Sequence, residues 1–193
     1  HFGKSTAVIA AWLISFMPAH VSHSTWALAD HDAFVMLFIS LGIMYWMKAM
    51  KYSGSDRLTK KSSPKLSSIL TSFGIVVRER KTAMSFAILA GVSFGVASLG
   101  WKGFVVGPSI LFLAYFVQVA LNMFRRRDST TINALFLTML GVNLLMAIPF
   151  YAHPQFDLIF DGTGLQPFIF VLGFSVVIAY ITTGFRDKPW LLV

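Results

Sequence analysis

Five long apolar runs constrain this chain more than any other feature. They contain no Asp, Glu or Arg, and their one basic residue, Lys48, lies close enough to an end to snorkel. The runs are 33–50, 83–100, 104–124, 130–151 and 167–185. Each is within the roughly 17–25 residues that a helix needs to cross a bilayer. Because a segment in lipid must satisfy its own backbone hydrogen bonds, the sequence predicts an all-α, multi-pass transmembrane helical bundle.

The composition excludes most classes of soluble protein. Of the 193 residues, 56% are hydrophobic and 12% are charged, whereas about a quarter of a typical soluble domain is charged. The chain has no cysteine, which excludes disulfides, thiolate metal sites and cysteine nucleophiles. A net charge of +8 would suggest a nucleic-acid partner in a soluble domain. Here the cations follow the membrane topology instead, so we expect no nucleic-acid partner.

The basic residues are divided unequally between alternate connections. Lys102 is the one cation on one side, and the other 15 of the 16 Lys and Arg residues belong to the opposite side, within residues 1–4, 48–81, 125–127 and 186–188. Cytoplasmic connections carry the excess of Lys and Arg in multi-pass membrane proteins. We therefore expect a protein of the cell membrane whose outer connections are 19–32, 101–103 and 152–166.

The long cytoplasmic connection 51–81 is basic and rich in Ser, with Gly54 and Pro64 as helix breakers. Its second half, 65–81, mixes apolar and basic residues. Two interpretations remain open: a helix that lies on the membrane surface against anionic lipid, or a solvated linker that leads into the next membrane helix.

Small and amide side chains within the runs predict helix packing. The pair Gly91 and Gly95 indicates a close approach of two helices. Asn122, Asn133 and Asn143 are expected to form hydrogen bonds between helices rather than to bind a substrate.

The outer segment 19–32 concentrates the candidate ligands of the chain. Asp30 and Asp32 flank His31 immediately before a membrane helix. Two carboxylates at this spacing can turn toward one hard cation, and Mg²⁺ and Mn²⁺ prefer oxygen ligands. Alternatively Asp30 caps the following helix, where Asp is favoured and negative charge suits the helix N-terminus. The pattern leaves both roles open.

Trp101 and Lys102 lie in a short outer turn between two runs. One interpretation is an interfacial Trp anchor beside a snorkelling Lys. The other is that this lone outer cation and its aromatic neighbour receive a phosphate or an anionic lipid headgroup.

The order of these motifs resembles a known family. The motifs are Pro18, Ser-His-Ser at 22–24, Asp-His-Asp at 30–32, Ala-Gly-Val-Ser-Phe-Gly at 90–95 and Leu-Gly-Trp-Lys-Gly at 99–103. Together they are similar to the catalytic subunit of the oligosaccharyltransferase in its archaeal form. The resemblance implies a GT-C type membrane domain. From the apolar runs themselves we expect about five complete helices, with partial ones at both ends.

The resemblance also implies an activity. Such an enzyme transfers an oligosaccharide from a dolichol phosphate or diphosphate carrier to Asn in the Asn-x-Ser/Thr sequence of an acceptor polypeptide. A Mn²⁺ or Mg²⁺ ion would be held on the outer face, with Asp30 as an acidic ligand and Asp32 at the second position of that motif. His31 and Trp101 match contacts near the lipid phosphate, and Lys102 is the neighbouring cation.

Some features depart from the family pattern. His23 stands where Arg is frequent and Ala27 where Gly is frequent. A first acidic motif, a Glu-bearing outer loop and a soluble domain are not found, so we expect residues 1–193 to be an inactive internal fragment of one transmembrane domain. The alternatives are another GT-C enzyme that uses a dolichol-linked sugar, and a transporter or scaffold. A transporter would carry ionisable groups within its spans.

Overall fold

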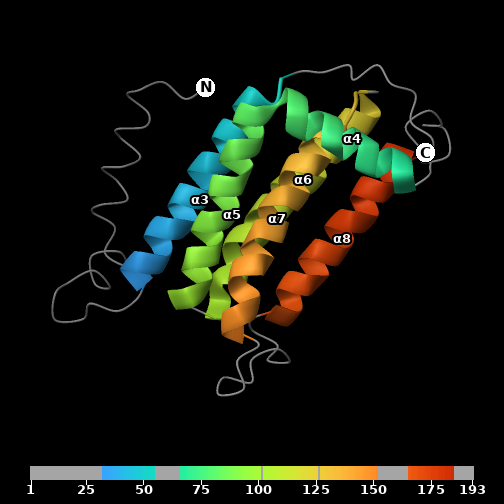
Figure 1. Cartoon of the computed structure of the whole chain (residues 1–193). Helices are drawn as coiled ribbons and strands as arrows, with labels where there is room; N and C mark the ends of the chain where they lie inside the picture. Colours follow the sequence, from blue (N-terminus) through green and yellow to red (C-terminus); the bar gives the residue numbers. More distant parts are fainter. Residues whose placement is uncertain (1–31, 55–65, 101, 126, 152–164, 185–193) are drawn as a thin grey trace, which may run out of the picture.

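The computed structural model describes residues 32–54, 66–100, 102–125, 127–151 and 165–184, and every regular element in these ranges is a helix. Five helices are long and apolar enough to cross a membrane, and they stand side by side as a bundle (Figure 1). They are α3 (Asp32–Tyr52), α5 (Lys81–Gly100), α6 (Val106–Phe124), α7 (Thr130–Tyr151) and α8 (Leu165–Gly184). The predicted fold class is confirmed, and each helix matches one of the apolar runs.

Two shorter helices occupy the ends of the bundle. The 3₁₀ helix η2 (Lys102–Val105) joins α5 to α6, and α4 (Leu66–Glu79) lies across the opposite end (Figure 1). Helix α4 contacts α5, α7 and α8, with Val76 fully buried and Arg78 and Glu79 exposed. This part of the connection 51–81 is therefore an amphipathic helix packed on the bundle, and the solvated-linker interpretation is wrong for residues 66–79.

Helix α5 is the centre of the bundle and packs against α3 and α7. Most of its buried residues are small, which permits close approach where lipid removes the usual hydrophobic driving force. A Cβ atom on Gly91 would lie 2.5 Å from the carbonyl oxygen of Met139, and one on Gly95 would lie 2.6 Å from Sδ of Met146. The predicted close packing at this glycine pair is confirmed, and its partner is α7.

One aromatic ring fills the space between three helices. Phe94 of α5 is fully buried, and glycines make room for it on both neighbours. A Cβ atom on Gly42 of α3 would lie 2.7 Å from the Phe94 ring, and one on Gly107 of α6 would also lie 2.7 Å from it. The ring therefore sets the spacing of α3, α5 and α6.

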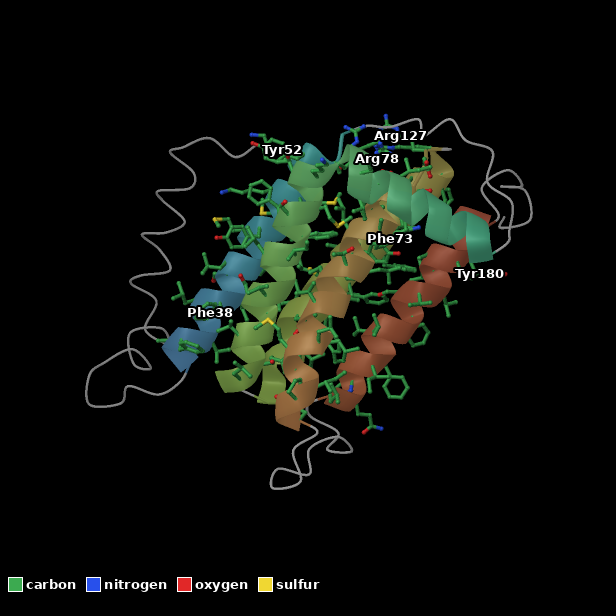
Figure 2. The ribbon with its side chains drawn as sticks, in the orientation of Figure 1. Phe38, Tyr52, Phe73, Arg78, Arg127 and Tyr180 are labelled. Atoms are coloured by element: carbon green, nitrogen blue, oxygen red, sulfur yellow. The ribbon has the colours of Figure 1, made fainter. Side chains whose placement is uncertain are left out.

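The two ends of the bundle differ in charge. The basic end, where α3, α6 and α8 end and α5 and α7 begin, carries every described cation except Lys102: Lys48, Lys51, Arg78, Arg80, Lys81, Arg125 and Arg127. Figure 2 shows Arg78 and Arg127 together with Tyr52 at this end. The opposite end, where α3 begins with Asp32, is called the Asp32 end below.

Hydrogen bonds between polar side chains join the helices toward the basic end. The hydroxyl of Tyr115 donates to Oδ1 of Asn133 at 2.9 Å, and Nδ2 of Asn133 donates to Oγ1 of Thr182 at 2.9 Å, which links α6, α7 and α8. Nδ2 of Asn122 donates to Oγ of Ser129, just before α7, at 3.3 Å. The predicted interhelical hydrogen bond is confirmed for Asn133. Asn122 bonds instead to the connection between α6 and α7.

Asn143 does not follow this pattern. Its side chain is fully buried, and neither its amide nitrogen nor its amide oxygen has a hydrogen-bond partner in the described structure. The residues one helical turn away on α7 are Met139, Leu140, Met146 and Ala147, which offer no side-chain donor or strong acceptor. The prediction of an interhelical hydrogen bond is wrong at this position.

Candidate functional site at the Asp32 end

The Asp32 end gathers the ends of six described elements. Helices α3 and α8 begin here, α5 and α7 end here, and η2 connects α5 to α6 (Figure 1). Of the predicted site residues, Asp32 is the first residue of α3 and Lys102 is the first residue of η2. Asp30, His31 and Trp101 lie outside the described residues.

A close contact joins the end of α5 to the start of α3. Gly100, the last residue of α5, lies against the first turn of α3. A Cβ atom on Gly100 would be 3.1 Å from Cγ2 of Val35 and 3.2 Å from Cδ1 of Phe34. The end of α5, two residues before Lys102, thus lies directly beside the helix that begins at Asp32. Of the two motifs, the structure describes the backbone of Asp32 and of Lys102, and both lie at this end of the bundle.

Three buried aromatic rings hold η2 in place. The Phe104 ring lies 5.5 Å from the Tyr151 ring and 5.7 Å from the Phe168 ring, measured between centroids, and all three side chains are almost completely buried. The Tyr151 hydroxyl donates to the carbonyl oxygen of Ser98 at 3.3 Å. This aromatic cluster fixes η2 against α5, α7 and α8, and so it fixes the backbone position of Lys102.

The sequence matches the family described as Oligosaccharyl transferase STT3, N-terminal, over residues 1–187. The chain belongs to the STT3 family. No curated protein and no solved structure matches it. At the level of the family, this STT3 chain is a multi-pass membrane protein with a GT-C type membrane domain. Its family consists of glycosyltransferases of protein N-glycosylation, which act on a lipid-linked oligosaccharide and a polypeptide acceptor.

A divalent cation in this STT3 chain would need ligands from several segments. No group of three or more His, Asp or Glu side chains that could hold a metal occurs in the described ranges. The Asp32 end contributes a single described acid, Asp32 itself, since Glu79 and Asp128 belong to the basic end. Mg²⁺ takes about six oxygen ligands. A carboxylate, the donor type of Asp32, fits such an ion, but a single carboxylate would supply only part of its coordination shell.

Sequence reasoning did not find the aromatic cluster. Phe104, Tyr151 and Phe168 each lie near a helix end on the predicted outer side, where aromatic residues are common. That signal indicates that the rings lie near the membrane interface, but not whether they point into the bundle or toward lipid. The rings point into the bundle rather than toward lipid, and only the relative rotation of the helices decides this.

Proposed function

We propose that this STT3 chain forms part of the membrane domain of an archaeal-type oligosaccharyltransferase. The enzyme transfers an oligosaccharide from a dolichol phosphate or diphosphate carrier to Asn in Asn-x-Ser/Thr. The family match supports the transfer reaction. The contact of Gly100 with Phe34 and Val35 supports one shared site at the Asp32 end, because it brings the helices that begin at Asp32 and Lys102 together.

Each predicted residue has a role in this proposal. Asp30 and Asp32 would hold Mn²⁺ or Mg²⁺, which when bound would supply positive charge to offset the negative charge on the leaving lipid phosphate. His31, Trp101 and Lys102 bind the lipid phosphate. Lys102 places a cation next to that phosphate, and the aromatic cluster supports the backbone of η2, which begins at Lys102. A positioned charge of this kind needs no reorganisation during the reaction.

The proposal places the Asp32 end on the extracytoplasmic side of the cell membrane. The support is the concentration of Lys and Arg at the opposite end. Residues 1–193 contain no cysteine, so Lys102→Cys and Arg125→Cys each introduce one label site within these residues. A membrane-impermeant maleimide applied to intact cells should label the first and not the second. If only the Arg125→Cys variant were labelled, the proposed orientation would be wrong, and the basic end would lie outside the cell.

The metal role is tested in the full-length protein with a lipid-linked oligosaccharide and an Asn-x-Ser/Thr peptide. Asp30→Asn and Asp32→Asn should each lower glycopeptide formation about 100-fold, the size expected for loss of one strong electrostatic contact in an active site. Both should also raise the Mn²⁺ concentration needed for half-maximal activity. Asp157→Asn is the matched control, since it removes one carboxylate from another predicted outer connection. Unchanged activity and unchanged Mn²⁺ dependence in both motif variants would refute the metal role.

A further inference from the structure

An open pocket of about 260 Å³ lies at the basic end, far from the site proposed above. It forms where α3 ends, α4 ends and α5 begins. Tyr52, Arg78, Glu79, Arg80, Lys81 and Thr82 line it. Figure 2 shows Tyr52 and Arg78 at this end of the bundle. We call it the elbow pocket, because α4 and α5 meet there at an angle with only Arg80 between them.

The elbow pocket presents mainly hydrogen-bond donors and positive charge. Arg78, Arg80 and Lys81 contribute three cations, against one carboxylate from Glu79. The first turn of α5 also faces the pocket and contains no acidic residue. The first N–H groups of a helix have no partner within the helix and favour a nearby anion. A phosphate group suits this combination, since guanidinium groups bind its oxygens with strong charge-assisted hydrogen bonds.

The walls of the pocket are set by the backbone. The N–H of Arg80 donates to the carbonyl oxygen of Val76, and the carbonyl oxygen of Arg80 accepts from the N–H of Met84, both at 2.9 Å. These bonds join the end of α4 to the start of α5. On the other side Gly54 takes a φ of +70°, and a Cβ atom there would lie 3.1 Å from Nη1 of Arg80. The turn after α3 therefore packs directly against the Arg80 guanidinium.

The pocket lies at the depth of lipid headgroups. The α3 span ends at Tyr52 and the α5 span begins at Lys81, so both helices leave the apolar layer there. The rings of Tyr45, Phe86 and Tyr52 form a stack with centroid separations of 6.2 and 5.5 Å, and Nζ of Lys48 lies 5.5 Å from the Phe86 centroid. Aromatic and basic side chains of this kind mark the membrane interface.

We propose that the elbow pocket binds the phosphate of an anionic lipid headgroup. The bound lipid would fasten the amphipathic helix α4 to the start of α5, and the proposal does not depend on the reaction at the Asp32 end. Free inorganic phosphate has the same charge chemistry, but the headgroup depth of the pocket favours a lipid source. Amphipathic surface helices with basic residues are attracted to anionic lipid in the same way.

The test measures lipid affinity in the full-length protein in detergent micelles. Short-chain phosphatidylglycerol is titrated, and the rise in thermal unfolding midpoint gives the apparent affinity. A cation close to an anionic headgroup contributes about 1 kcal/mol, which is about fivefold in affinity. Arg78→Gln combined with Lys81→Gln should therefore weaken binding roughly 30-fold. Both side chains are exposed, so the double variant should still fold.

Two further variants make the test specific. Arg125→Gln combined with Arg127→Gln removes the same charge from exposed positions at the basic end outside the pocket, and it should weaken binding much less. Glu79→Gln removes the one carboxylate and should tighten binding about fivefold. Equal losses in the two double variants, or no effect of Glu79→Gln, would overturn the pocket assignment.

A titration with inorganic phosphate distinguishes a lipid headgroup from free phosphate as the ligand of the elbow pocket. Titrated alone, it should raise the unfolding midpoint less than phosphatidylglycerol at the same concentration. An equal or larger rise with inorganic phosphate would overturn the lipid assignment, because the acyl chains would then contribute nothing.

Discussion

The two ends of the bundle are held together by different kinds of contact. At the Asp32 end the described contacts are mainly apolar, with the rings of Phe104, Tyr151 and Phe168 packed together and Gly100 against α3. Toward the basic end Tyr115, Asn133 and Thr182 form a chain of hydrogen bonds between three helices. Polar groups that satisfy one another are not available for a substrate. The difference therefore assigns a structural role to Tyr115, Asn133 and Thr182.

The largest expected effect comes from breaking the aromatic cluster. Phe104→Ala should lower the free energy of unfolding by about 3 kcal/mol, because it leaves a cavity among fully buried rings. Glycopeptide formation should fall with it, since η2 and Lys102 lose their support. Denaturant unfolding in micelles and an activity assay measure the two quantities.

The matched control for that variant is Phe116→Ala, which truncates a half-exposed ring on α6. Its cost should be much smaller, and activity should persist. Similar costs for the two variants would mean that the aromatic cluster does not organise the Asp32 end.

The next effect distinguishes two asparagines of the same helix. Asn133→Leu should cost about 2 kcal/mol, because it removes two interhelical bonds and leaves the buried Tyr115 hydroxyl without its acceptor. Asn143→Leu should leave stability unchanged or raise it, since it replaces two buried polar atoms that have no partner. The comparison uses thermal or denaturant unfolding. A loss at Asn143 as large as that at Asn133 would show that Asn143 is hydrogen-bonded after all.

Two glycines at the basic end should respond to alanine substitution with opposite changes in stability. Gly54→Ala should destabilise by about 1.5 kcal/mol, because its positive φ disfavours a side chain and Arg80 occupies the space. Gly74 lies within α4, and apart from its chain neighbours and the helix backbone no atom lies within 4 Å of an added Cβ. Gly74→Ala should therefore raise the free energy of unfolding by up to about 1 kcal/mol. Unfolding midpoints of the two variants decide the point. Equal signs would contradict the packing of α4 and the α3 turn described above.

The smallest effect concerns binding of the lipid donor. Lys102→Gln should raise the KM for the lipid-linked oligosaccharide about fivefold, as expected for one cation near a phosphate. The matched loss of a cation at the basic end, Arg125→Gln, should leave this KM unchanged. Steady-state kinetics of the full-length protein test both. An equal rise in both variants would indicate a general charge effect and remove the specific role of Lys102.

Much of the fold and part of the site can be predicted from the sequence. The five apolar runs became α3, α5, α6, α7 and α8 with nearly the same bounds, and the glycine pair on α5 correctly indicated a close helix contact. For the candidate site, the sequence indicated Asp and Lys residues near helix ends, among them Asp32 and Lys102. The aromatic cluster, the space for Phe94 and the elbow pocket could not be predicted, because each joins residues from different helices.

The sequence predicts which segments are helices but not how they rotate, because lipid solvates every apolar face of a helix equally well. Hydropathy depends only on local sequence, so the spans, their order and the separation of charge follow from it directly. The buried face of α5, α7 or α8 does not, because lipid is as apolar as the bundle interior and these helices are apolar on all sides. Helix α4 is the exception, since it borders water and its amphipathic pattern was visible. Tertiary packing alone decided the rotation of the spanning helices, and with it which residues meet at each end.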